Sequence, residues 1–509
     1  MSQVKLGAIL SYAVLGLNNI VGVLFLPFMI SRLGSSEFGI FSLITSLLAY
    51  LTVLDFGFGN AVVRFTAKFK AESKGDKLKG MYGSFLVLYL FVGFIAFFIC
   101  LLFWWNADFL FGDSMSEEEV HKIGIMLLML SVNVIFLFPL STFSNIVLGH
   151  ERFVVHKVAL FLRILLNTIA MVALVLYGHG AIALLLSTTV FNIICFAFYA
   201  WYAIAILGVQ MRFGLLKWKE LKEYVFYSYY VFLNTVMDKI FWSSGQLVLG
   251  MVSGATAVAI FSIGIQLQRV YMASSSAISG VMLPKVTKLV AIGGSRGDVS
   301  NLFIRVGRVQ FIVLLYILFA FILFGKEFVS LWVGEEFQDA FIIGLMFFGA
   351  LMVPLMQNVG ISILQARNQM KFRSYLNLLN AFVCLVLQFV FSKYWGAVGC
   401  AGAIVVSLLV GNGLIMNIYY QKKHSIKIYD FWFNIFSMAS VPVAVFFVCF
   451  CIKIFIGFDL SINLGIICFF IYTLTFFLIM WLFSLNEFEK KLVISLFEKC
   501  KGVLNRGAV

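Results

Sequence analysis

The sequence predicts an all-α integral membrane protein of about 14 transmembrane helices. Of its 509 residues, 62% are hydrophobic and only 12% are charged, and the mean hydropathy is +1.03. Soluble domains contain roughly 45–50% apolar residues. Apolar runs of the roughly 20 residues needed to cross a bilayer recur from end to end. Only short polar loops separate these runs, so little chain remains for a soluble domain.

The individual spans follow from splitting the chain at its loop signals, because a membrane helix needs roughly 17–25 residues. The predicted spans are 7–30, 39–62, 82–105, 123–147, 156–177, 180–206, 225–250, 255–283, 306–325, 340–364, 374–393, 397–420, 432–456 and 462–484. The first is too long for a signal-peptide core and lacks a small-residue cleavage site. We therefore expect it to be a retained helix.

The basic residues predict the orientation. With the N-terminus inside, about 29 of the 37 Lys and Arg fall in cytoplasmic segments and about 4 in external loops, as the positive-inside rule requires. An even number of spans then returns the C-terminus to the cytoplasm. The net charge of +14 therefore mostly reflects the orientation of the chain in the membrane. Because the basic residues are scattered over many loops, we expect no nucleic-acid partner.

Short internal matches indicate a repeat. The segment 34–42 reads GSSEFGIFS and 254–262 reads GATAVAIFS, while 72–76 reads ESKGD and 294–298 reads GSRGD. Six helices per copy is an even number, so both copies enter from one side as parallel repeats. We expect two six-helix lobes, 1–210 and 211–425, around a central cavity. Residues 426–509 add two helices and a cytoplasmic tail.

Several motifs resemble those of one transporter family. They are SRLGSSEFGIFS at 31–42, LDFGFGNAVVRF at 54–65, AESKGDKLKG at 71–80 and FGKEFVSLWVGEEF at 324–337. In these motifs the chain resembles the Wzx-type polysaccharide flippases of the multidrug/oligosaccharidyl-lipid/polysaccharide exporter superfamily, and the similarity covers nearly the whole chain.

The resemblance implies a fold like that of the multidrug exporters of the superfamily, and alternating access in a bacterial cytoplasmic membrane. It implies that an oligosaccharide on a polyprenyl pyrophosphate is moved across that membrane, before polymerisation into O-antigen, capsule or a related polymer. Membrane lipids, a polysaccharide polymerase and a chain-length regulator are the other partners it suggests.

Charges inside the predicted spans are the best site candidates, because each costs roughly 2.5–3.5 kcal/mol near the bilayer centre. They are Asp55, Arg163, Asp238, Lys239, Arg269 and Lys453. Three of the cations share a helix face with an amide, in the pairs Arg163–Asn167, Arg269–Gln266 and Lys239–Gln246. We predict that these six residues bind pyrophosphate and sugar in the cavity, since Arg donors suit phosphate oxygens. The alternative is structural pairing or snorkelling, and snorkelling is the expectation for Lys453.

A second group is predicted to act in gating or coupling. Asp55 precedes FGFGN, whose glycines permit a bend or close packing, and pairing with Arg64 would make it part of an inner gate. Asp238 raises the hypothesis of proton or sodium coupling, because a buried carboxyl holds its proton more tightly. Arg32 is expected to be an outer gate contact or anchor. Structural pairing is the alternative for both carboxylates.

The sequence lacks several motifs of enzymes and metal sites, which reduces the classes of function to consider. The sequence contains no GxxxxGK[ST], HExxH, paired CxxC or GxSxG, so we expect neither an enzyme nor a metal or organic cofactor. One rival hypothesis is a drug or metabolite antiporter of the same superfamily, but about four basic and two acidic span residues favour an anionic cargo. The other is a membrane glycan polymerase or glycosyltransferase, against which the short loops argue.

Overall fold

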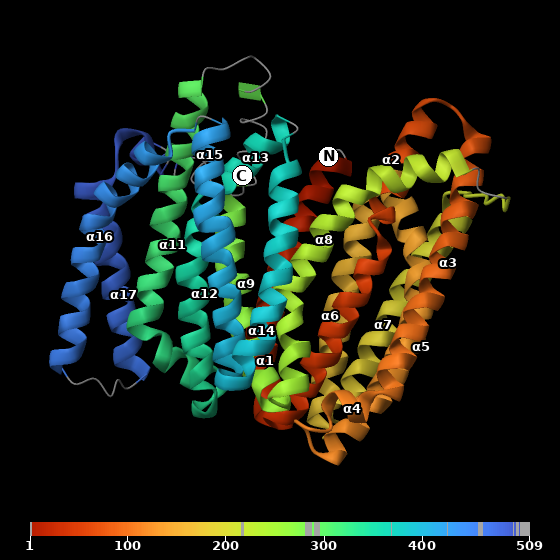
Figure 1. Ribbon diagram of the computed structural model, residues 1–509, viewed down its shortest axis with the longest axis horizontal. Helices are drawn as coiled ribbons and strands as arrows, with labels where there is room; N and C mark the ends of the chain where they lie inside the picture. Colours follow the sequence, from red (N-terminus) through yellow and green to blue (C-terminus); the bar gives the residue numbers. More distant parts are fainter. Residues whose placement is uncertain are drawn as a thin grey trace, which may run out of the picture. The chain divides into compact units, whose positions relative to one another are not determined.

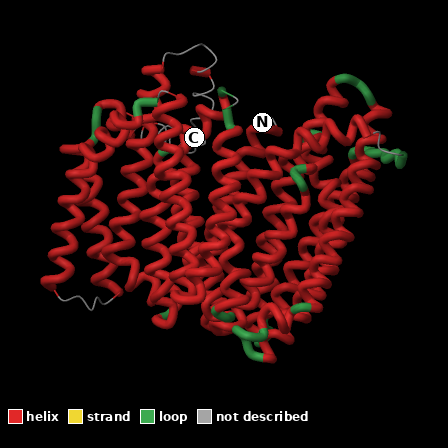
Figure 2. The backbone as a smooth tube through the Cα atoms, in the orientation of Figure 1, coloured by secondary structure: helices red, strands yellow, loops and turns green. Residues whose placement is uncertain are grey.

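The computed structural model of the chain describes residues 3–214, 218–279, 288–289, 296–367, 369–424, 426–456, 462–491, 493–494 and 498. All regular structure in these residues is helical (Figure 2). The chain forms two compact units, unit 1 with Met1–Gln266 and Ser374–Ile404, and unit 2 with Leu267–Arg373 and Val405–Val509. These units cut across the predicted lobes 1–210 and 211–425, so the lobe division remains a prediction.

Unit 1 is a bundle of long helices in which α3 and α5 lie side by side (Figure 1). Its elements are α1 (Gln3–Leu51), η1 (Thr52–Asp55), α2 (Phe58–Ala71), α3 (Gly75–Trp105), α4 (Ala107–Phe111), α5 (Glu117–Gly149), α6 (Phe153–Leu176), α7 (Ala181–Trp201), the π-helical η2 (Tyr202–Ile206), α8 (Trp218–Val252), and parts of α9 (Ala255–Ser279) and α14 (Lys371–Ser407).

Unit 2 holds the remaining helices, and α11 packs against both α12 and α16 there. Its further elements are α11 (Arg296–Val333), η3 (Glu335–Phe337), α12 (Gln338–Met356), α13 (Asn358–Ala366), the π-helical η4 (Leu408–Ile415), α15 (Met416–His424), α16 (Ile428–Ile456), α17 (Ile462–Ile479) and the π-helical η5 (Met480–Ser484).

Ten helical stretches of the described residues are long and apolar enough to cross a membrane. Two of them, Leu6–Asp55 and Lys371–Lys423, have 50 and 53 residues, and each contains a glycine with non-helical backbone angles. At about 1.5 Å per residue, such stretches exceed twice the roughly 30 Å hydrocarbon core. The all-helical membrane fold is confirmed, whereas the total of 14 spans remains a prediction.

Local sequence explains which helix faces point outward. On α3, Phe85, Tyr89 and Ala96 are buried, while Phe91 and Phe98 are exposed at 64% each. A soluble protein would not present such rings to water, but lipid tails solvate them without cost. The high apolar content of the chain therefore serves two purposes, since it fills the core and also covers the surface that faces lipid.

The first repeat motif has the same backbone geometry in both copies. Gly34 has φ +81° and Gly254 has φ +85°, and each begins one of the two matching segments. This left-handed conformation is open to glycine at little cost, and it lets the chain turn between two consecutive helices. The ESKGD copy links α2 to α3, whereas the first two residues of GSRGD lie outside the described residues and the last three begin α11.

The predicted second span, 39–62, is interrupted. The α-helix ends at Leu51, η1 follows, and α2 starts only at Phe58. Phe56 and Gly57 have φ values of +50° and +73°, so the backbone cannot continue as a right-handed helix there. The ring of Phe56 lies 4.9 Å from that of Phe232 on α8. The bend expected at the glycines after Asp55 is thus present.

Candidate functional site

Arg163 and Asn167 lie half-buried on α6 and turn toward α7. The Arg163 guanidinium donates a hydrogen bond to the Asn192 side-chain oxygen. One turn further along α6, the Asn167 oxygen accepts a hydrogen bond of 2.9 Å from the Ser187 hydroxyl. The predicted i, i+4 pair therefore forms part of a polar seam between two neighbouring helices.

The polar seam fixes the Arg163 side chain but does not neutralise its positive charge. Asn192 is a neutral acceptor, and no carboxylate of the described residues forms an ion pair with Arg163. A further contact of α7, between Asn133 on α5 and Thr189 at 2.9 Å, is also neutral. A guanidinium fixed by an amide in this way keeps donors and a full charge for an anion.

The second predicted arginine is also without a carboxylate. Arg269 lies on α9 with an exposed side chain, and among the described residues it has neither a hydrogen bond nor an ion pair. Lys239 on α8 is half-buried, and its neighbour Asp238 is exposed. The burial on which the coupling hypothesis for Asp238 depends is therefore not found at that residue.

The two predicted glutamines are buried. Gln246 on α8 is 6% exposed, and its side-chain oxygen has no hydrogen-bond partner in the described residues. Gln266 on α9 is 9% exposed and packs against Gly22 of α1, where an added Cβ would meet its nitrogen at 2.2 Å. A glycine at this point lets the two helices approach closely.

Asp55 ends η1 at the break in the second span and is half-buried. One carboxylate oxygen accepts a hydrogen bond from the Tyr89 hydroxyl of α3, and the other lies 3.4 Å from the Gly59 amide nitrogen. Asp55 thus caps the first turn of α2, where unpaired N–H groups favour negative charge. The contact with Tyr89 was not predicted, because Tyr89 lies 34 positions from Asp55 in the sequence and no local pattern links the two.

Arg64 and Arg32, the two arginines predicted to act in gates, have exposed side chains. The Arg64 guanidinium lies 5.9 Å from the centre of the neighbouring Phe65 ring on α2. Arg32 lies near the turn at Gly34 and forms no hydrogen bond or ion pair with the described residues. The contacts of Asp55 are to Tyr89 and Gly59, and its pairing with Arg64 remains a prediction.

Lys453 behaves differently from the expectation. Instead of extending alone to an interface, its ammonium group lies 2.7 Å from a carboxylate oxygen of Glu327 on α11 and also donates to the Leu323 carbonyl. Glu327 lies 126 residues away within the motif FGKEFVSLWVGEEF. The expectation of snorkelling did not include this ion pair, which forms because α16 packs against α11 and places a carboxylate within reach.

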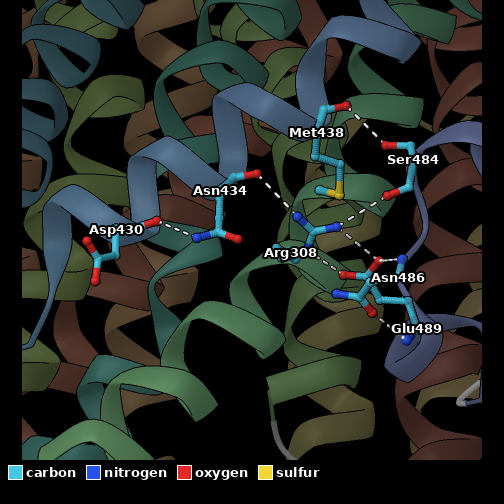
Figure 3. A network of polar contacts seen from close by, with 7 residues as sticks. All are labelled: Arg308, Asp430, Asn434, Met438, Ser484, Asn486 and Glu489. Atoms are coloured by element: carbon cyan, nitrogen blue, oxygen red, sulfur yellow. Dashed lines mark hydrogen bonds and ion pairs between the residues drawn. The ribbon is translucent and has the colours of Figure 1, made fainter.

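A buried ion pair in unit 2 joins Arg308 of α11 to Glu489. Figure 3 shows Arg308 with its Nε 2.6 Å from one oxygen of Glu489 and a second nitrogen 3.2 Å from the other. The same guanidinium donates to the carbonyls of Asn434 and Ser484, at 3.3 Å each. This bidentate contact ties the segment after η5 to α11 and α16.

Basic side chains gather where α2 and α5 end and where α3 and α6 begin. His150, which follows α5, contacts the Lys70 ammonium at 3.3 Å through Nδ1 and the Tyr82 hydroxyl at 3.1 Å through Nε2. Burial, with the charges of Lys70 and Arg152 adding to it, lowers the pKa of His150 to about 4. The imidazole is therefore neutral at physiological pH.

Within the described residues no three His, Cys, Asp or Glu side chains cluster as a metal site would require.

Comparison with known proteins places this geometry in a family. Residues 4–290 match the family described as polysaccharide biosynthesis protein. The chain belongs to that family. A curated relative, the Shigella flexneri protein named "Putative O-antigen transporter", is 20% identical over 404 residues, which are 77% of this chain and 92% of the relative. The resemblance that the motifs predict is confirmed for this member of the polysaccharide biosynthesis family.

Solved structures show the same fold. The lipid II flippase MurJ in an inward closed conformation superposes with a TM-score of 0.66 at 15% identity, covering 93% of this chain and 99% of MurJ. An inward-facing multidrug resistance MATE family transporter gives a TM-score of 0.63 at 14% identity, covering 82% and 94%. At these identities the likeness establishes the fold alone, and the predicted exporter-like architecture of this family member is confirmed.

Proposed function

We propose that this member of the polysaccharide biosynthesis family is a flippase for oligosaccharides carried on a polyprenyl pyrophosphate. It moves the sugar-bearing head across the bacterial cytoplasmic membrane for the synthesis of O-antigen, capsule or a related polymer. Support comes from the family match, from the Shigella flexneri relative and from the fold shared with a lipid II flippase. Both termini lie in the cytoplasm in this proposal.

The main support for an anionic cargo is that the cations of the predicted spans differ in whether they have a carboxylate partner. Lys453 has a carboxylate partner, whereas among the described residues Arg163 has only a neutral amide and Arg269 has no partner. Uncompensated charge in a membrane helix is costly and is retained where it meets a substrate, an ion or a cavity. A pyrophosphate with four or more acceptor oxygens would supply the missing negative charge.

Transport then proceeds by alternating access, with the cations facing the head group and most of the hydrocarbon chain remaining in lipid. Consumption of the product on the far side, or a proton or sodium gradient, supplies the driving force. Asp55 is the better-placed coupling carboxylate, because it is half-buried at a helix break while Asp238 is exposed. This coupling role is part of the proposal.

The test uses single substitutions in a cell that depends on this protein for surface polysaccharide. Arg163→Gln and Arg269→Gln are expected to lower export at matched protein levels and to cause accumulation of lipid-linked oligosaccharide. Arg269→Lys should restore part of the export, because it keeps the charge but loses the planar fork. Lys422→Gln, at an exposed position near the end of α15, is the control. Unchanged export in both Gln variants would refute the cationic site.

A further inference from the structure

A cavity of about 320 Å³ lies inside unit 1, between α1 with η1, α3, α5 and α8. Its walls include Leu51, Cys100, Phe103, Leu130 and Ile240, and almost no polar atom reaches its surface. The volume is about twice that of the ~150 Å³ apolar cavity that accepts benzene, and it falls at the lower end of the ~300–1,000 Å³ range of ligand pockets. The space is therefore large enough for part of a hydrocarbon ligand.

Water is a poor occupant of this cavity. A buried water needs two to four hydrogen-bond partners. Tyr50 is the wall residue with a hydroxyl, and that hydroxyl faces Ser244, whose own hydroxyl lies 2.6 Å from the Gln388 oxygen. The Cys100 thiol is only a weak donor. The cavity is thus suited to an apolar ligand.

The cavity lies at the depth of hydrocarbon, away from the head groups. On α8, which ends at Val252, the wall residues Leu247 and Val236 are about 8 and 24 Å from that end, at about 1.5 Å per residue. The hydrocarbon core of a bilayer is about 30 Å thick. With Val252 taken as the boundary of that core, the cavity covers depths of about 8–24 Å and crosses the middle of the membrane.

We propose that this cavity binds a segment of the polyprenyl chain of the carrier lipid. The inference rests on the proposed function, in which the carrier is the lipid that must stay attached to the cargo during transport. A polyprenyl chain is methyl-branched and longer than one leaflet, so part of it has to lie at mid-depth. The branched walls of Leu, Ile and Val side chains at that depth are complementary to it, and the walls come from helices both before and after residue 210.

The site would give the protein a second point of recognition, separate from the cations. The head group is recognised by charge, and the chain is recognised by shape and by exclusion of water. Because α1, α3 and α5 supply one side of the wall and α8 the other, a bound chain would favour the arrangement of these helices seen here. A carrier with a shortened chain would therefore bind less well even with an unchanged head.

Photolabelling of the purified full-length protein in lipid nanodiscs tests the proposal. The probe is a polyprenyl pyrophosphate without sugar that carries a diazirine in its chain, and the comparison probe is a phosphatidylglycerol with a diazirine in an acyl chain. We expect the prenyl probe to label peptides that contain Phe103 and Val236, and excess unlabelled polyprenyl phosphate to compete. Equal labelling of these peptides by the acyl probe, without such competition, would assign the cavity to bilayer lipid and overturn the proposal.

Filling the cavity gives a second test. Cys100→Phe and Leu130→Phe place a ring in the space from two different helices, so a loss of label in both separates an effect on the cavity from a local effect on one helix. Each should lose most of the prenyl label, while Cys451→Phe, at an exposed position of α16, should keep it. Thermal stability identifies any variant that does not fold. Persistent labelling in both folded variants would refute the site.

The two proposals fail in different ways. Because the probe carries no sugar, its binding can be measured without transport. Export of polysaccharide by the wild-type protein together with no prenyl labelling of the cavity would refute the chain site and leave the flippase function standing. Absence of any effect of this protein on polysaccharide export would refute the function itself.

Discussion

Replacing Glu489 by Ala should destabilise unit 2 strongly, because it leaves a guanidinium buried without its counter-ion. Arg308 is 8% exposed and Glu489 is 2% exposed. The substitution removes two charge-assisted hydrogen bonds, of 2.6 and 3.2 Å, each worth about 1.5–3 kcal/mol. The total of about 3–6 kcal/mol agrees with the ~3–5 kcal/mol found when one partner of a buried pair is removed. The two carbonyls that remain on Arg308 favour the lower end, about 3 kcal/mol.

The assay is heat-induced loss of the monodisperse protein in detergent, followed by size-exclusion chromatography. If unit 2, with about 210 residues, unfolds cooperatively, about 3 kcal/mol lowers its Tm by about 6–12 °C. The double variant Arg308→Met with Glu489→Met should recover most of this loss, since well-packed apolar residues often replace a buried ion pair at no cost. An unchanged Tm in Glu489→Ala would refute the reasoning, and so would a double variant that is less stable than either single one.

The remaining predictions concern unit 1. Asn192→Asp should give Arg163 a carboxylate partner, so export should fall as in Arg163→Gln while thermal stability is kept; unchanged export would show that the free charge is not used. Gly39→Val should lower stability by about 1–3 kcal/mol, because a Cβ there would lie 2.0 Å from the Ala255 carbonyl oxygen, whereas at Gly16, the control, it meets nothing within 4 Å; equal effects of the two would contradict the close packing. Stability should fall as the pH drops from about 6.5 toward 4, because the pKa of His150 is lowered to about 4 and the unfolded chain binds a proton first. His150→Gln should flatten this part of a stability–pH profile, and a profile identical to that of the wild type would remove His150 as its cause.

The sequence placed the candidate site residues on helices but did not predict their contacts. Arg163, Arg269 and Asp55 were singled out because charge is rare in the spans, and each lies on a helix as expected. Their partners were not predictable, because Asn192 and Tyr89 are ordinary residues in their own segments. Lys453 shows the same limit, since its carboxylate partner Glu327 lies 126 residues away and was not predicted.

Breaks in helices were only partly predictable. The glycines after Asp55 indicated a bend, but the left-handed Phe56 was not foreseen, because a bulky residue with positive φ is rare. Its ring packs against Phe232 of α8, a contact between distant parts of the chain. Gly34 and Gly254 begin the two matching segments of the repeat, and the structure shows that both have a positive φ.

The sequence by itself determined that the chain crosses a membrane many times, that its regular structure is helical and that it belongs to a polysaccharide transport family. Hydropathy, the positive charge of loops and repeated motifs are properties of local segments, and a bilayer selects for each segment separately. The tertiary structure alone decided which charges are compensated, where the second span breaks and where an apolar cavity remains. These features depend on side chains that meet from distant positions, such as Arg308 and Glu489 at a separation of 181 residues, and no local pattern encodes such a meeting.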